Sequence, residues 1–583
     1  MIKKLVLLAA FGMLLFNASV QAAQIPQLIL DDQWKLAIGD NPAWATNSFD
    51  ASSWKTVSST KSWEDQGFPD VDGFGWYRKE VVLPTTLKAD IMKYGGIRVC
   101  YDNADDADEF YFNGHYIGVT GAMPPAYVSK YGQKRSYTVP SKFVYFDRPN
   151  LMAVRVYDGI GGGGLITANT TVRPLSVTDV IKIDWDFPAK EWVFSDGDKQ
   201  QMNLTLTNTL KAKAALKVVF VLKTDKFAPV DSIVTTFELK AGATLSGLVP
   251  FKLPAPGFYR CTLFMEKDGA TSIPETFNIG YEPEKIVSPR DAKPDFDAFW
   301  KETRAQLDAF APDFRMELMP ERSTGARNLY HVTMQSYGNV TIEGYYAAPK
   351  APGKYPAIIT YMGYGSDPWF PNTDGEPGFA NFVLSVRGQG IQKASQKLFW
   401  GDWIIWGLDS KDTYYYRGAF MDLVRGVDFL VSRPEVNVDQ IVAEGGSQGG
   451  AFTLAACSLD ARIKAAAPTI PFLSDYPDYF SIVNWPKSSF ENYLKAHPDK
   501  TWKEVYEILT YFDIKNLTGW IKCPIFMAAG LQDPVCPPHT NFAAYNQIRS
   551  KKDYRIYKDQ GHGTPSEWND LRMKFFREAL GLK

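Results

Sequence analysis

The residues of this 583-residue chain that are best suited to chemistry surround Ser447. They form the segment 445–450, Gly-Gly-Ser-Gln-Gly-Gly, which follows an apolar run at 441–444 and precedes small and apolar residues at 451–456. This order predicts a strand, a tight turn and a helix, with the serine hydroxyl exposed at the strand end. The neighbours must be small because a Cβ atom would clash in so sharp a turn. The pattern is typical of a nucleophile elbow and predicts acyl transfer through a serine.

A serine hydroxyl is a weak nucleophile, so it needs a base, and a third group must orient that base. After a nucleophile elbow, the triad is expected in the chain order serine, acid, histidine, each in a loop that follows a strand. His562 follows the last predicted strand and Asp533 follows the strand before it, so they are the predicted base and acid. Asp559 stays open as an alternative acid. His539 stays open as an alternative base, although it is expected to begin a helix.

The negative charge that develops on the attacked carbonyl oxygen needs hydrogen-bond donors. One predicted donor is the backbone amide of Gln448, directly after the serine and at the start of the expected helix. The other is the amide of Tyr364, in the loop Met362-Gly363-Tyr364-Gly365 after an earlier strand. No metal ion or other cofactor is expected for this chemistry.

Residues 283–583 must supply the elements that position these groups. Apolar runs predict strands, and one apolar stripe with a helical period predicts a helix over 419–430. The predicted strands cover 357–361, 382–386, 441–443, 524–528 and 554–557. Alternation of this kind predicts an α/β domain with a mostly parallel sheet and helices on both faces. The functional groups are then expected at the carboxyl ends of the strands.

The two preceding segments are predicted to be all-β sandwiches. Residues 24–175 contain alternating strand patterns and an Asn113-Gly114 hairpin signal, with no sustained helical period. They resemble the galactose-binding-like jelly-roll modules found beside many carbohydrate-active enzymes. Residues 176–282 contain about seven short strand patterns, which suit an immunoglobulin-like sandwich without chemistry of its own. A proline-rich linker then leads into the α/β domain.

Composition narrows the classes of partner. The formal net charge is −2 with both signs interspersed, so neither a nucleic acid nor an anionic membrane is indicated as a partner. Aromatic residues make up 14% of the chain, which suits stacking on sugars but equally suits β-sandwich cores. The five cysteines are scattered and are expected to be free thiols, with a pair between Cys523 and Cys536 as the alternative.

The first 23 residues read as a secretory signal peptide. Lys3 and Lys4 begin it, an apolar stretch covers 5–16, and small residues at 20–23 form the expected cleavage site. The apolar stretch is too short for a membrane-spanning helix. The sequence therefore predicts export, to the periplasm in preference to the medium.

The α/β segment is similar to carbohydrate esterase family seven, which comprises acetyl xylan esterases and cephalosporin C deacetylases. The matching pieces are Asp533 with Pro537-Pro538 and the segments 295–300, 344–346, 363–364, 387–390 and 445–450. One departure is Gly563, which stands where the family usually has Glu after the histidine.

The resemblance implies an α/β-hydrolase that removes O-acetyl groups from plant polysaccharides or oligosaccharides through a Ser-His-Asp triad. It also implies that Arg387 and Gln389 support the active-site loops. It implies a homo-oligomer as well, although the two added sandwiches weigh against the family's usual hexamer.

Two other functions are compatible with the sequence. One is a serine peptidase of the prolyl-oligopeptidase type, which shares the hydrolase fold but usually carries a propeller domain. The other is a carbohydrate-binding protein with a degenerate hydrolase domain. The stretch 470–510 is expected to form a cap over the site. Four aromatic residues either form a platform on which a sugar stacks or simply pack in the core. They are Trp369, Phe370, Tyr479 and Trp485.

Overall fold

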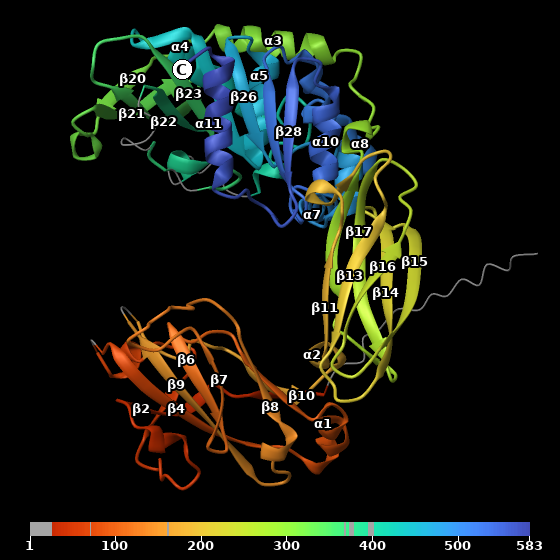
Figure 1. Cartoon of the computed structure of the whole chain (residues 1–583). Coiled ribbons are helices and arrows are strands. Elements are labelled where there is room, and N and C mark those ends of the chain that lie inside the picture. The colour runs from red at the N-terminus through yellow and green to blue at the C-terminus, as the bar shows by residue number, and fades with distance from the viewer. Residues whose placement is uncertain are drawn as a thin grey trace, which may run out of the picture.

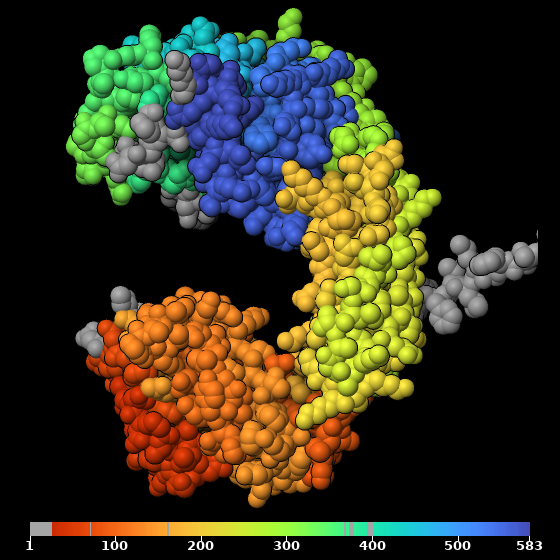
Figure 2. All heavy atoms as spheres, in the orientation of Figure 1, coloured from red at the N-terminus to blue at the C-terminus, as the bar shows by residue number. Residues whose placement is uncertain are grey.

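The computed structural model describes residues 26–69, 71–159, 162–366, 369–371, 378–393 and 402–582. These residues form three successive regions arranged like a letter C, with an open gap between the first region and the last (Figures 1 and 2). The predicted signal peptide, residues 1–23, lies outside the described residues. No described helix has both the length and the apolar character that crossing a membrane requires.

The first region contains two antiparallel sheets. The described strands of one sheet are, in order, β1 (Leu28–Leu30), β10 (Thr170–Pro174), β5 (Gly96–Tyr101) and β8 (Arg135–Pro140). Those of the other sheet are, in order, β3 (Lys55–Ser58), β2 (Gln33–Ile38), β4 (Gly73–Val82), β9 (Pro149–Asp158), β6 (Ala107–Phe112) and β7 (His115–Thr120). The predicted hairpin turn joins β6 to β7, with φ of 50° at Asn113 and 79° at Gly114. Both values suit a type I′ turn, whose twist matches that of the strands.

One element of this region differs from the expectation of strands alone. Residues Lys88–Tyr94 form helix α1, which buries Ile91 and Tyr94 and ends at Gly95 with φ of 79°. A helix of this length is too short for a helical period to emerge from the sequence.

The second region also contains two sheets. The described strands of one sheet are, in order, β11 (Ile181–Asp186), β13 (Gln201–Asn208) and β16 (Thr244–Pro250). Those of the other sheet are, in order, β12 (Val193–Phe194), β19 (Glu275–Tyr281), β17 (Gly257–Lys267), β14 (Ala214–Thr224) and β15 (Pro229–Leu239), and β18 (Ala270–Thr271) also pairs with β17. The short helix α2 (Val177–Val180) precedes them. Both sheets contribute to one buried cluster, which includes Leu204 and Leu206 of β13 and Val218 and Phe220 of β14. Alternate residues of β13 are therefore buried, as its sequence pattern predicts.

The third region contains a mixed sheet. Its described strands run in the order β20 (Arg315–Leu318), β21 (Arg327–Gln335), β22 (Thr341–Pro349), β24 (Ala380–Ser385), β23 (Tyr355–Tyr361), β25 (Val436–Gly446), β26 (Ile463–Thr469), β27 (Ile525–Gly530) and β28 (Lys552–Tyr557). The pairs from β20 to β24 are antiparallel, and every pair from β24 to β28 is parallel. The carboxyl ends of the parallel strands therefore meet at one edge.

Helices cover both faces of this sheet. Ile359 of β23 joins a core with the helices α3 (Phe296–Asp308), α4 (Tyr415–Val431), α5 (Gln448–Leu459), α9 (Ile514–Leu517) and α10 (Pro538–Gln547). Its neighbour Ile358 packs instead with Trp568 and Phe576 of α11 (Glu567–Ala579). Adjacent residues of β23 point to opposite buried layers, which is why its segment 357–361 is largely apolar.

The stretch predicted as a cap contains α6 (Tyr476–Ile482), α7 (Lys487–Ala496) and α8 (Trp502–Leu509). Helices α7 and α8 lie at the end of the sheet that is next to the second region (Figure 1). The backbone carbonyl of Ile482 accepts a hydrogen bond of 3.1 Å from Arg260 of the second region. This stretch thus joins two regions in addition to bordering the site described below.

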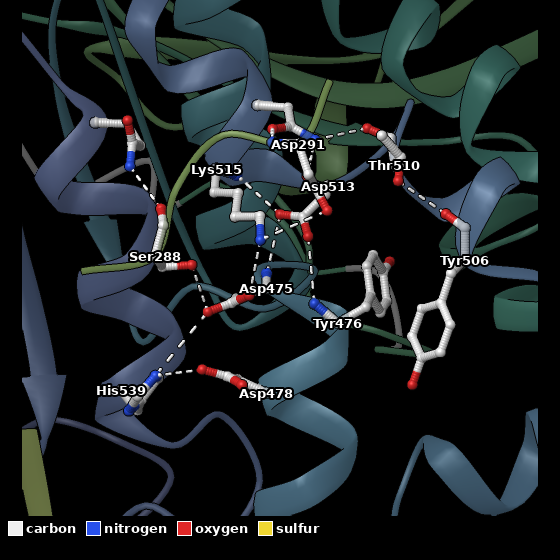
Figure 3. Close-up of polar contacts among 12 residues, drawn as sticks. Ser288, Asp291, Asp475, Tyr476, Asp478, Tyr506, Thr510, Asp513, Lys515 and His539 are labelled. Atoms are coloured by element: carbon white, nitrogen blue, oxygen red, sulfur yellow. Dashed lines mark hydrogen bonds and ion pairs between the residues drawn. The ribbon is translucent and has the colours of Figure 1, made fainter. Parts of the chain in front are cut away.

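A buried network of charged residues lies beside this junction (Figure 3). Asp475 accepts hydrogen bonds from the hydroxyl of Ser288, at 2.7 Å, and from the ammonium of Lys515, at 2.8 Å. Asp513 accepts from the amides of Asp475 and Tyr476, at 2.9 and 3.2 Å. The network fixes the linker, the start of α6 and the start of α9 against one another. Burial raises the pKa of Asp513 to about 7.

The predicted multidomain chain, with a sheet-rich N-terminal part and a C-terminal α/β part, is confirmed. The finer assignments, a jelly-roll module and an immunoglobulin-like sandwich, stay predictions. So do the domain boundaries after residues 175 and 282. These boundaries fall in the connections between β10 and β11 and between β19 and α3.

Candidate active site

Ser447 occupies the predicted sharp turn between β25 and α5. Its φ of 59° and ψ of −120° are rare for a residue with a side chain. A Cβ on Gly445 would come within 2.5 Å of the carbonyl oxygen of Gly449, and one on Gly449 within 2.1 Å of that of Tyr361. These two glycines are therefore required by close backbone approach, while the strain is concentrated at the serine.

Three residues from distant loops meet at this turn. His562 Nε2 lies 3.0 Å from Ser447 Oγ, and His562 Nδ1 lies 2.9 Å from Asp533 Oδ2 and 3.1 Å from its Oδ1. If Nδ1 carries the proton and donates it to the carboxylate, Nε2 is free to accept the serine proton. The predicted serine, base and acid thus lie within hydrogen-bond distance of one another.

The carboxylate of Asp533 is held in place by its own loop. Its Oδ1 accepts the amides of Val535, at 2.8 Å, and Cys536, at 2.9 Å. Asp533 is 2% exposed, so the charge that faces His562 is shielded from water. The Cys536 thiol lies 3.9 Å from Ser447 Oγ, and burial raises the pKa of this thiol, which favours its neutral form.

The two alternative triad members have other surroundings. His539 is the second residue of α10, and its ring nitrogens contact Asp225 at 2.7 Å and Asp478 at 3.0 Å. Burial lowers the pKa of His539, but its hydrogen bonds to Asp225 and Asp478 outweigh this and raise the pKa to about 9. Asp559 is exposed. The carboxylate that contacts His562 Nδ1 is that of Asp533.

The two predicted oxyanion donors lie on segments that Gln389 holds together. Gln389 Oε1 accepts the Gly365 amide at 3.0 Å, directly after Tyr364. The same oxygen accepts from Gln448 Nε2 at 3.1 Å, and Gln389 Nε2 donates to the hydroxyl of Tyr415 at 2.9 Å. The Gln448 amide is the first of α5, where backbone N–H groups have no partner within the helix.

Arg387 lies deeper than Gln389. Its guanidinium donates to both carboxylate oxygens of Asp422 on α4, at 2.9 and 2.7 Å, and to the carbonyl of Tyr337 at 2.9 Å. Both members of this ion pair are buried. Arg387 therefore anchors the loop that carries Gln389, and it does not contact Ser447.

A pocket of about 680 Å³ opens at the serine and the histidine. Trp369 and Phe370 line it, together with Thr469 and Trp568. Tyr479 instead is 1% exposed and donates to the carbonyl of Val535 at 2.6 Å, so it packs under the acid loop.

Trp485 packs on the ring of Tyr364, with centroids 5.5 Å apart. Of the four aromatic residues singled out in the sequence, Trp369 and Phe370 border the pocket. Tyr479 and Trp485 have packing contacts.

Two groups of side chains in the described part of the chain have the spacing of metal ligands: Asp475, Asp478 and His539, and separately Asp105, Asp106 and Asp158. In the first group Lys226, at 2.5 Å from Asp478, and Lys515 already supply positive charge. In the second, burial and the neighbouring carboxylates Asp158 and Asp106 raise the pKa of Asp105 to about 6. Neither group touches the serine site.

The five cysteines are free thiols, as expected. The alternative pairing of Cys523 with Cys536 is not formed, because Cys523 contacts the Cys457 thiol instead.

Sequence reasoning did not identify Gln532 and Asn278. Asn278 of β19 donates its amide to Gln532 Oε1 at 2.7 Å, and its side chain donates to the carbonyl of Leu531 at 3.0 Å. These bonds tie the residues just before Asp533 to the second region. No local pattern signals them, since the partners are 254 positions apart.

Comparison with known proteins identifies the family. A family model described as acetyl xylan esterase (AXE1) matches residues 280–579. Acetyl esterase Axe7A of Xylanibacter ruminicola is 28% identical over 317 residues, which cover 52% of this chain and 71% of that protein.

Two solved structures are also similar. One is acetyl xylan esterase 1 from a Thermoanaerobacterium species, at 30% identity over 51% of this chain and 98% of that one, with a TM-score of 0.47. The other is an acetyl xylan esterase from a Paenibacillus species, at 30% identity over 51% and 98% of the two chains, with a TM-score of 0.48.

The family model spans more than half of the chain, and the resemblance to carbohydrate esterase family seven is confirmed. This membership favours ester hydrolysis over the peptidase and the non-catalytic alternatives. The chain belongs to the acetyl xylan esterase (AXE1) family and is a carboxylic ester hydrolase.

Proposed function

We propose that this enzyme removes O-acetyl groups from plant polysaccharides or their oligosaccharides, with Ser447 as nucleophile, His562 as base and Asp533 as the acid that orients it. The observation that carries the proposal is the unbroken chain of contacts from Ser447 Oγ through His562 to Asp533, at 3.0 and 2.9 Å, in a member of the AXE1 family. The family's description as acetyl xylan esterase, and a relative known as an acetyl esterase, support acetyl groups on carbohydrate as the substrate class.

In the first half-reaction, Ser447 Oγ bonds to the acetyl carbonyl carbon and transfers its proton to His562 Nε2. The amides of Gln448 and Tyr364 donate to the oxygen on which negative charge develops. The bond between the carbonyl carbon and the sugar oxygen then breaks, and the sugar leaves with the proton from His562. An acetyl group remains on Ser447.

In the second half-reaction, water attacks the acetyl carbon and gives a proton to His562. The bond to Ser447 Oγ breaks, the serine regains a proton from His562, and acetate leaves. Throughout, Asp533 keeps the imidazole in the tautomer whose Nε2 accepts protons. Each step uses only the three side chains, the two backbone amides and water.

The pocket supports a sugar-bearing substrate. Trp369 is 41% exposed and lines the pocket beside Phe370, so it offers an aromatic surface next to the serine. Aromatic rings stack on the C–H faces of sugar rings because the ring face is electron-rich. The neighbouring Arg572 and Asn569 supply polar groups for hydroxyls.

The test is release of acetate from acetylated fragments of xylan, pectin and mannan. We expect the wild-type enzyme to release acetate from at least one of them and Ser447→Ala to lose roughly 10⁴-fold or more in kcat. Near-normal hydrolysis by Ser447→Ala would disprove the nucleophile, whereas inactivity of the wild type on every glycan would disprove the substrate class.

We also propose that the chain is exported after cleavage near residue 23, which the composition of its first residues supports. N-terminal sequencing of the protein recovered from the periplasmic fraction tests this.

A further inference from the structure

A second cleft, of about 780 Å³, lies between the second region and the α/β region. The second region contributes Trp185, Trp192 and Phe227, and the α/β region contributes Asp533 and Pro534. Clefts of this size at a boundary between domains are common places for ligands. We propose that this cleft binds the carbohydrate chain that continues from the acetylated sugar in the serine pocket.

Phe227 is the most informative residue of the cleft. It lies in the turn between β14 and β15 with φ of 65°, which is unusual for a bulky residue, and 51% of it is exposed. Folding alone gains nothing from a strained backbone that presents a phenyl ring to water. The Arg260 guanidinium stacks over this ring, 4.3 Å from its centroid, and is itself fixed by the carbonyls of Asp225 and Ile482, at 3.1 Å each.

The two tryptophans are fixed in a similar way. Trp185 donates its indole N–H to Glu275 at 3.0 Å and stacks on Phe277, with centroids 4.2 Å apart. Trp192 donates its indole N–H to Asp186 at 2.7 Å, and its ring centroid lies 5.1 Å from that of Trp185. Because both indoles are held by their polar edge and remain partly exposed, binding a ligand on them costs little side-chain entropy.

The remaining polar groups of the cleft define the ligand. Lys223 and Glu275 are exposed and of opposite charge, and Thr262 and Thr276 also line the cleft. Mixed charges and hydroxyls do not favour a polyanion such as a phosphate, and they interrupt any apolar surface suited to lipid. Aromatic faces with scattered hydrogen-bonding groups suit a chain of sugars, whose C–H faces stack and whose hydroxyls pair.

The cleft is close to the proposed chemistry. Asp533 and Pro534 of the acid loop line it, while the buried carboxylate of Asp533 contacts His562 at 2.9 Å and His562 contacts Ser447 Oγ at 3.0 Å. In this proposal, a glycan held at the serine continues over the acid loop, past Pro534, onto the second region. This inference rests on the proposed function, because it takes the occupant to be the same acetylated glycan.

The experiment compares two substrates in the full-length enzyme, 4-nitrophenyl acetate and acetylated xylo-oligosaccharides. The variants are Phe227→Ala and Trp185→Ala, with Phe227→Tyr as the conservative exchange. Leu248→Ala is the matched control, because Leu248 is 55% exposed in the same region and lies outside the cleft.

We expect the two alanine variants to lose about five- to ten-fold in kcat/KM on the oligosaccharides and less than about two-fold on the small ester. Phe227→Tyr and Leu248→Ala should match the wild type on both substrates. An unchanged kcat/KM on the oligosaccharides, or an equal loss on both substrates, would overturn the subsite.

A binding measurement tests this proposal independently of the proposed function. Deacetylated xylo-oligosaccharides are titrated calorimetrically into Ser447→Ala, with and without Phe227→Ala. A dissociation constant that rises about five-fold or more on adding Phe227→Ala supports the subsite even if the acetylated substrate proves wrong. No binding, or binding that does not depend on Phe227, overturns it even if xylan deacetylation is established.

Discussion

The side-chain amide of Gln532 pairs with both backbone groups of Asn278. Gln532 Oε1 accepts the Asn278 amide at 2.7 Å, and its Nε2 donates to the Asn278 carbonyl at 3.1 Å and to the Lys558 carbonyl at 2.9 Å. Strand β12 pairs with β19 only at Gly280 and Tyr281, so Asn278 lies on an otherwise open part of the strand edge. A strand of the second region thereby braces both loops that carry His562 and Asp533.

Loss of this brace should impair turnover and leave substrate binding largely intact. We expect Gln532→Ala to lower kcat about ten-fold with little change in KM, because the acid loop loses its alignment with His562. Asn278→Ala removes only the 3.0 Å bond to the Leu531 carbonyl, so its kcat should fall only about two- to three-fold. Steady-state kinetics on 4-nitrophenyl acetate measure both variants, and a wild-type kcat for Gln532→Ala contradicts the argument.

The acid of the triad can be distinguished from its neighbour by one pair of variants. Asp533→Asn should lower kcat roughly 10⁴-fold, because the amide stabilises the wrong imidazole tautomer and cannot stabilise the imidazolium. Asp559→Asn makes the same chemical change three residues from His562 and should lower kcat on 4-nitrophenyl acetate by less than about two-fold. A large loss for Asp559→Asn alone would reverse the assignment.

Gln389 should be needed for the oxyanion donors. Gln389→Ala leaves the Gly365 amide and the Gln448 side chain without the acceptor they share, so the Tyr364 loop can move away from the helix start. We expect kcat on 4-nitrophenyl acetate to fall about 10²-fold with a smaller change in KM. Gln440→Ala is the control, because Gln440 donates to the Leu580 carbonyl far from the serine and should keep full activity.

The junction between the second region and the α/β region should weaken at high pH. The pKa of His539 is about 9 in the folded chain against 6.5 as its ordinary value, because Asp225 and Asp478 outweigh the effect of burial. The stabilisation from protonated His539 is complete below pH 6.5 and is lost as the pH rises through 9. Its size is about 3 kcal/mol.

Urea unfolding of the wild type and His539→Gln at pH 6 and pH 10 measures this effect. The difference in free energy of unfolding between the two proteins should be large at pH 6 and small at pH 10. A difference that is equal at both pH values would show that the charge on His539 does not hold the junction.

Elements that have a local cause could be predicted from the residues alone. The elbow needs glycines at 445 and 449 because a Cβ at either position would clash with neighbouring backbone. Such a turn is therefore recognisable as a glycine pattern in the sequence. The central parallel strands contain apolar runs because both faces of the sheet are covered there, so their positions were predicted. The Asn113-Gly114 turn was predictable for the same local reason, since few other residues adopt positive φ twice in succession.

Contacts between residues far apart in the chain depend on how the strands and regions pack. Sequence order proposed His562 and Asp533, but their contact depends on β27 and β28 lying side by side. The separation of His539 from the serine, its pairing with Asp225, and the brace between Asn278 and Gln532 have no local signature. The free energy of each such contact depends on the packing of whole regions against one another, and residue spacing along a chain does not encode that packing.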